Sequence, residues 1–114
     1  MNRYVVLYLA PLSVAERFAQ VAPAEAAKGM QLWVDWSTRL GPALLDPGKP
    51  LGNARRITRT ETTETPSEVI GMSILQATSM DEALKLVDNH HHLHWADECE
   101  IVILEEQPLP ELQS

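Results

Sequence analysis

A strand-like segment that runs directly into a capped helix constrains the fold of this chain most. Residues 69–77, Val-Ile-Gly-Met-Ser-Ile-Leu-Gln-Ala, have the length and apolar content of a β-strand. Ser79 follows as an N-cap, and Glu82 completes a capping box three residues later. A helix over 80–90 would then place Met80, Ala83, Leu84 and Val87 on one face. Strand, helix and a final strand make up half of a ferredoxin-like βαββαβ unit.

The rest of the chain supplies the other half of that unit. Pro11 ends a first strand, and Ser13 with Glu16 forms a second capping box that opens a short helix to about Gln20. Pro23 then begins a long amphipathic helix that ends at Gly41-Pro42. The sequence therefore predicts an α+β, ferredoxin-like fold with strands at 3–9, 69–77 and 100–106, a weaker strand at 55–60, and helices ending near residues 20, 40 and 90.

The segments between these elements are rich in turn-forming residues. Residues 46–53, Asp-Pro-Gly-Lys-Pro-Leu-Gly-Asn, predict a loop, which is either a plain connection or a functional segment. Residues 62–66 predict a polar turn. Residues 107–114, with Pro108 and Pro110, predict a loose tail after a single domain over 1–106.

The first, third and last predicted strands are apolar on both faces. Two helices and one short helix cover only one face of a four-stranded sheet. The other face would expose more apolar surface than monomers usually do, so the sequence predicts a homodimer that packs sheet against sheet.

Composition narrows the range of partners. The net charge of −7 argues against nucleic acid, which requires a basic face. No apolar run approaches the ~20 residues of a membrane span, and the first residues have no signal-peptide pattern. Cys99 stands alone, so we expect it in the core rather than in a disulfide. These features predict a soluble, cytoplasmic protein.

All four histidines lie within five positions: His90, His91, His92 and His94. Imidazole groups bind metals or transfer protons near neutral pH. The spacing matches no common zinc motif, so we expect no metal and no cofactor. Two interpretations stay open. The histidines either stabilise a helix C-terminus, or they line a ligand pocket.

In the pocket interpretation, His90 or His92 is the acid–base group and Asp46 is its carboxylate partner. Trp36, Lys49 and Met72 would line the pocket. Adjacent histidines cannot all point the same way, and we expect His91 to be the solvent-exposed one.

Several pieces of this chain resemble the YCII-related domain family, and especially its DGPF branch. They are the start Tyr-Val-Val-Leu-Tyr at 4–8, the helix segment 23–33, the loop 45–52, and Gly-Met-Ser-Ile-Leu-Gln-Ala at 71–77, continuing through 79–83 to His-His-His-Leu at 90–93. The last piece is similar to the branch signature "GYSILQA…SLDEAL…HPHL". The family has proline at the position of His91.

The resemblance implies a ferredoxin-like fold that dimerises into an α+β barrel. It also implies acid–base chemistry by a His–Asp pair in members near the founding protein. The positions of that histidine and aspartate fall near Glu25 and at His90, so the pair is not intact here. Two functions follow: a dimeric small-ligand-binding or regulatory accessory protein, or alternatively a small-molecule lyase or isomerase.

Overall fold

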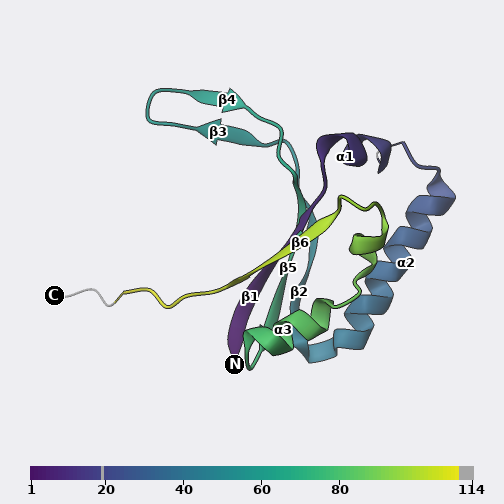
Figure 1. The fold of residues 1–114 in the computed structure, drawn as a ribbon, viewed down its shortest axis with the longest axis vertical. Helices are drawn as coiled ribbons and strands as arrows, with labels where there is room; N and C mark the ends of the chain where they lie inside the picture. The colour runs from purple at the N-terminus through teal and green to yellow at the C-terminus, as the bar shows by residue number, and fades with distance from the viewer. Residues whose placement is uncertain (19, 111–114) are drawn as a thin grey trace.

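The computed structural model describes residues 1–18 and 20–110. Its main sheet has four antiparallel strands in the order β2-β5-β1-β6. The strands are β1 (Asn2–Leu9), β2 (Leu44–Pro50), β5 (Val69–Ala77) and β6 (Glu100–Glu105). With α2 (Pro23–Leu40) after β1 and α3 (Met80–Val87) after β5, they form the predicted ferredoxin-like βαββαβ unit (Figure 1).

The helices lie on one side of this sheet (Figure 1). Inward side chains alternate along β1 and β5, where Tyr4, Val6, Tyr8 and Leu75 are almost completely buried. They pack with Trp36 and Leu40 of α2 and with Ala83 and Val87 of α3. Full burial of an aliphatic side chain such as Leu75 contributes roughly 1.5–3 kcal/mol to the stability of the fold.

Helix boundaries follow their capping signals. α2 begins with Pro23 in its first turn and ends at Gly41, whose φ of 55° breaks the helical path. Ser79 caps α3 by accepting the backbone N–H of Glu82 at 3.2 Å, as the capping box predicts. α1 (Leu12–Phe18) begins one residue before Ser13, so Ser13 lies inside the first turn rather than at the cap. Residue 19, in the predicted end of this helix, lies outside the described residues.

The predicted loop 46–53 is wrong over most of its length, because residues 44–50 form β2 at the edge of the sheet. An edge strand tolerates proline, and the register with β5 shifts twice. Gly48 permits this path with a φ of 93°. The helix predicted to residue 90 ends at Val87, and Asn89 reverses the chain with a φ of 55°.

The predicted polar turn at 62–66 is also wrong. Arg55–Ile57 (β3) and Thr62–Glu64 (β4) pair as a two-stranded hairpin inserted between β2 and β5. Figure 1 shows this hairpin, called the arm below, standing away from the main sheet. The predicted inner face of the helix over 80–90 also needs correction: Leu84 is exposed, and Leu86 packs on the core instead.

Candidate ligand-binding cleft

A cleft of about 580 Å³ lies between α2 and the sheet. Its apolar walls include Met30, Trp33 and Val34 of α2, Tyr8 of β1, and Trp95. The sequence explains the opening, since α2 carries apolar residues beyond the point where it contacts the core. Met30 and Val34 are 64% and 49% exposed, whereas Trp36 and Leu40 near the C-terminal end are buried. These apolar side chains are therefore available to a ligand.

Trp33 is the centre of an aromatic wall. Its ring lies edge-on to Tyr8 with centroids 4.8 Å apart, and it also contacts His90 and His91 at 5.1 and 4.9 Å. Trp95 continues this wall, 5.6 Å from the ring of His92. Such edge-to-face contacts are worth about 0.5–1.5 kcal/mol each beyond area burial. The wall is thus held in place before any ligand arrives.

The histidine cluster forms a short 3₁₀ helix, η2 (His91–His94), rather than the end of α3. His90 caps it, because its Nδ1 accepts the backbone N–H of His92 at 3.0 Å. The Nε2 of His92 donates to the carbonyl of Leu9 at 2.8 Å, which ties η2 to β1. His94 lies outside, 2.6 Å from the Oδ1 of Asn89.

Burial holds three of these imidazoles neutral. Desolvation, with smaller contributions from His91, His92 and Arg39, lowers the pKa of His90 to about 3. Desolvation and His92 lower the pKa of His91 to about 4. Desolvation also lowers the pKa of His92, against hydrogen bonds to the backbone of Leu9 and Glu100. Uncharged imidazoles next to tryptophan rings give this wall flat, largely apolar surfaces that suit a planar ligand.

A buried hydroxyl chain joins the floor of the cleft to β2. Ser73 donates to the carbonyl of Pro47 at 2.8 Å, so the hydroxyl of Tyr8 is the donor in its 2.9 Å bond to Ser73. Burial raises the pKa of Tyr8 to about 12. Tyr8 therefore stays protonated at neutral pH and fixes the bulged strand β2 beside the cleft.

The structure brings together only part of the predicted site. His92 and Lys49 line the cleft, whereas His90 lies buried among Tyr8, Trp33 and Trp36. Trp36 belongs to the core and donates its indole N–H to the carbonyl of Leu86 at 3.0 Å.

Asp46 accepts the backbone N–H of Gly48 at 2.8 Å within β2, and Met72 is the neighbour of Lys49 on β5. Neither is among the residues that line the cleft. Asp46 and Lys49 lie on a strand, not on the predicted loop. The expectation that His91 is solvent-exposed is wrong: it is half-buried and stacks on His90 at 4.2 Å, and His94 is exposed instead.

Sequence reasoning did not assign Tyr8, Trp33 and Trp95 to the site. Met30, Trp33, Val34 and Ser37 recur at helical spacing, a pattern that also fits a helix packed fully on the sheet. Two features separate a cleft wall from a core face: the corner formed by η2, and the outward course of the first half of α2. Both depend on tertiary structure.

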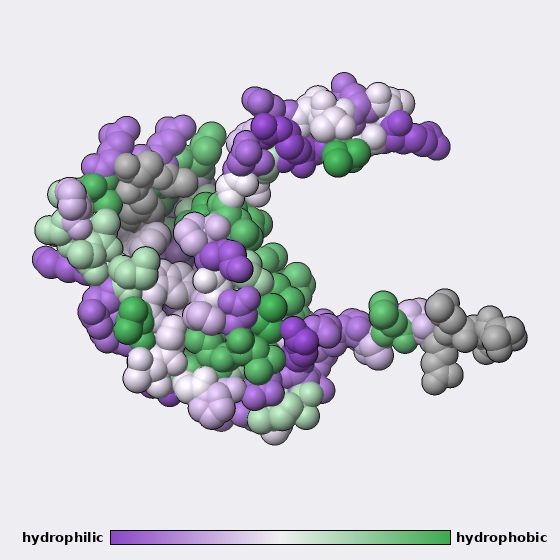
Figure 2. All heavy atoms as spheres, turned by 180° about the vertical axis from the view of Figure 1, so that it is seen from behind, coloured by the Kyte–Doolittle hydropathy of each residue, from purple (hydrophilic) through white to green (hydrophobic). Residues whose placement is uncertain are grey.

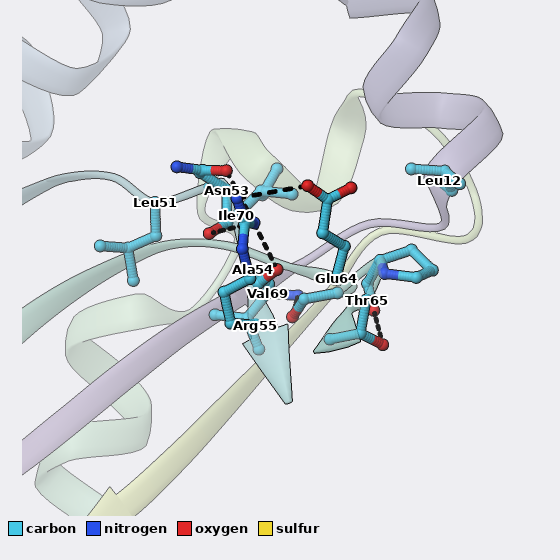
Figure 3. A pocket seen from close by; sticks show the side chains of 12 residues that line it. Leu12, Leu51, Asn53, Ala54, Arg55, Glu64, Thr65, Val69 and Ile70 are labelled. Atoms are coloured by element: carbon cyan, nitrogen blue, oxygen red, sulfur yellow. Dashed lines mark hydrogen bonds and ion pairs between the residues drawn. The ribbon is translucent and has the colours of Figure 1, made fainter. Parts of the chain in front are cut away.

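A second, more open hollow of about 630 Å³ lies at the base of the arm. Figure 3 shows Arg55 and Glu64 beside it, with Leu51, Val69 and Ile70 from the chain that leads into and out of the arm. The Arg55–Glu64 ion pair is 3.5 Å long and largely solvent-exposed. Because its charged groups are exposed, this hollow is a weaker candidate for binding a small molecule.

Within the described part of the chain, no three histidine, cysteine, aspartate or glutamate side chains are arranged to hold a metal ion. None of the described helices is long and apolar enough to cross a membrane.

Comparison with known proteins supports the fold. No protein-family model and no curated protein matches this chain. Among solved structures, it is similar to the 5-chloro-2-hydroxyhydroquinone dehydrochlorinase TftG of Burkholderia phenoliruptrix AC1100, in a complex with 2,5-dihydroxybenzoquinone. The TM-score is 0.55 at 15% identity, and the match covers 94% of each chain. At this identity the likeness shows a shared ferredoxin-like α+β fold.

Proposed function

We propose that this chain is a small-ligand-binding protein of the YCII-related type, DGPF branch, whose cleft holds a planar and mostly apolar molecule with a few polar substituents. The aromatic wall of Tyr8, Trp33 and Trp95 carries this proposal. The cleft volume lies within the ~300–1,000 Å³ of typical small-molecule sites. Ser37, Thr38 and Lys49 at its edge provide polar partners for ligand substituents.

The pKa values favour binding over acid–base catalysis. A general acid or base works best with a pKa near the working pH, and burial moves those of His90 and His91 to about 3 and 4. The alternative is a lyase or isomerase in which His90 or His92 is the acid–base group, with Asp46 assisting. Its support is the position of His92 in the cleft wall.

The dehydrochlorinase structure suggests a probe, since the ligand in that complex is a flat ring with oxygen substituents. Calorimetric titration with 2,5-dihydroxybenzoquinone tests the proposal. Val34→Trp should fill the cleft and weaken binding at least tenfold. Leu32→Trp is the matched control, because Leu32 is similarly exposed on the same helix and does not line the cleft. Equal affinities in both variants, or no binding of the probe to the unaltered protein at millimolar concentration, would contradict the proposal.

We also propose that two copies pack through the sheet face opposite the helices. On that face Val5, Leu7, Met72 and Ile74 are only half-buried, and Val102 and Leu104 are 38% and 51% exposed. Leu104→Lys should separate the copies in sedimentation equilibrium. An unaltered chain that sediments at 12.7 kDa at micromolar concentration would refute the dimer.

A further inference from the structure

The arm has little to stabilise it within its own chain. All residues from Arg55 to Glu64 are exposed, and Ile57 is 76% exposed. Its strands pair with each other in the register Arg55↔Glu64, and the backbone N–H of Thr58 donates to the carbonyl of Glu61 at 2.8 Å in the turn. An isolated two-stranded hairpin is marginally stable in water, so a second surface is needed to hold this one.

The arm and residues 106–110, called the C-terminal segment below, project on the same side of the sheet, away from α2 (Figure 1). Seen from behind, hydrophobic side chains gather on the body between these two projections (Figure 2). The second projection carries Leu109, which is 90% exposed. The arm and the C-terminal segment therefore flank the uncovered face of the sheet.

The sheet face alone gives an interface of limited extent. Four strands spaced ~4.8 Å apart and ~25 Å long give a footprint of about 500 Å². Stable interfaces bury ~800 Å² on each partner. Contacts beyond the sheet would enlarge this interface, and the arm extends in the right direction to provide them (Figure 1).

The arm also differs in the sign of its net charge from the rest of the chain. Residues 53–66 hold three arginines and two glutamates, a net charge of +1. The whole chain has a net charge of −7, so the remainder has a net charge of −8. Arg55 pairs with Glu64, whereas Arg56 and Arg59 form no ion pair among the described residues. Two acidic bodies repel each other, and a basic arm laid on the opposite body offsets that repulsion.

We propose that the β3–β4 arm grips a second copy of this chain. Arg56 and Arg59 lie on the acidic surface of the partner, and Ile57 adds apolar contact next to the packed sheet faces. By two-fold symmetry, each copy grips the other. This inference rests on the proposed sheet-face dimer and assigns the arm a role that the sheet face alone does not require.

Sedimentation velocity over a concentration series tests the arm. The double variant Arg56→Glu/Arg59→Glu should raise the dimer dissociation constant at least tenfold at low salt, and less at 0.5 M salt. Lys28→Glu/Lys85→Glu is the matched control, since it makes the same change in net charge on exposed sites of α2 and α3. It should raise the constant less than threefold.

Further variants separate failure of the arm from failure of the dimer. Replacing residues 54–65 with a short glycine turn should weaken the dimer as much as the charge reversal, with unchanged circular dichroism in the helical bands. A dimer that survives both changes, yet is lost in Leu104→Lys, would overturn the gripping arm and leave the sheet interface standing. A monomeric unaltered chain would overturn both. Equal weakening by the arm and control charge reversals would reduce the arm to a general charge effect and also overturn the proposal.

Discussion

The imidazole Nδ1 of His90 accepts the backbone N–H of His92 at 3.0 Å, and this bond holds the corner beside the cleft. An acceptor Nδ1 requires the neutral ring to carry its proton on Nε2. That Nε2 is buried and has no partner among the described residues. Protonation of Nδ1 would place its N–H opposite the backbone N–H of His92, two donors without an acceptor. The corner therefore depends on a neutral His90.

Stability should therefore fall in mild acid. The unfolded chain binds protons at His90 and His91 below a pKa of about 6.5, whereas the folded chain binds them only near pH 3 and 4. The two histidines contribute their full stabilisation above pH 6.5. As the pH falls toward 4, the free energy of unfolding decreases by up to about 1.4 kcal/mol per pH unit for each histidine. Urea unfolding between pH 7 and 5, above the range of most carboxylates, measures this slope.

A variant of the capping residue His90 tests whether that residue causes the pH dependence of the unfolding free energy. His90→Asn keeps a side-chain oxygen for the His92 N–H but does not titrate, so the slope should become shallower. His94→Asn changes an exposed histidine and should leave it unaltered. An unchanged slope in His90→Asn would contradict the assignment to His90.

The same bond predicts how the histidines affect ligand binding. His90→Ala removes the cap and should weaken binding of the cleft probe about tenfold, because His92 and Trp95 then lose their fixed position. His90→Asn should restore most of that affinity. His91→Ala should cost less, since it removes a half-buried ring that does not line the cleft. Calorimetry on the three variants decides the order, and a failure of asparagine to rescue would exclude the positioning role.

Gly48 provides a test of the bulged edge strand. A Cβ at this position would lie 1.6 Å from the carbonyl oxygen of Met72, and the φ of 93° disfavours any side chain. Gly48→Ala should cost at least ~3 kcal/mol of unfolding free energy. Gly52→Ala, where nothing lies within 4 Å, should change it by less than ~1 kcal/mol. Chemical denaturation compares the two, and a mild effect at Gly48 would disprove this course of β2.

The two hydroxyl groups of the buried chain, those of Tyr8 and Ser73, should differ in how much stability is lost when each is removed. Tyr8→Phe removes one bond and leaves Ser73 bound to Pro47, so it should cost about 1 kcal/mol. Ser73→Ala leaves both the Tyr8 hydroxyl and the Pro47 carbonyl without this partner, so it should cost about 2–3 kcal/mol. Thermal unfolding of both variants measures the difference. A smaller cost for Ser73→Ala than for Tyr8→Phe would contradict the arrangement.

The sequence predicts those parts of the fold that local rules govern. Two elements begin and end at the predicted residues, Val69–Ala77 and Pro23–Leu40. The strand has a clear apolar pattern, and the helix has Pro23 at its start and Gly41 after its end. β2 escaped prediction since Asp46, Pro47 and Gly48 are turn formers, and only pairing with β5 makes them a bulged edge strand.

The candidate site was less predictable for a related reason. The histidines could be recognised from the sequence as candidate site residues. Their burial and the course of η2, however, depend on packing against Leu9, Trp33 and Trp36. Trp33 fits a core helix and a cleft wall equally well in sequence. Tertiary geometry alone separates these two roles.

Indole N–H signals provide the most direct measurement of the cleft proposal. The chain has three tryptophans: Trp33 and Trp95 line the cleft, and Trp36 lies in the core with its N–H bound to Leu86. In ¹⁵N-labelled protein titrated with 2,5-dihydroxybenzoquinone, the signals of Trp33 and Trp95 should shift together with one dissociation constant, while that of Trp36 stays nearly fixed. Signals that do not move, or a shift confined to Trp36, would contradict the proposal.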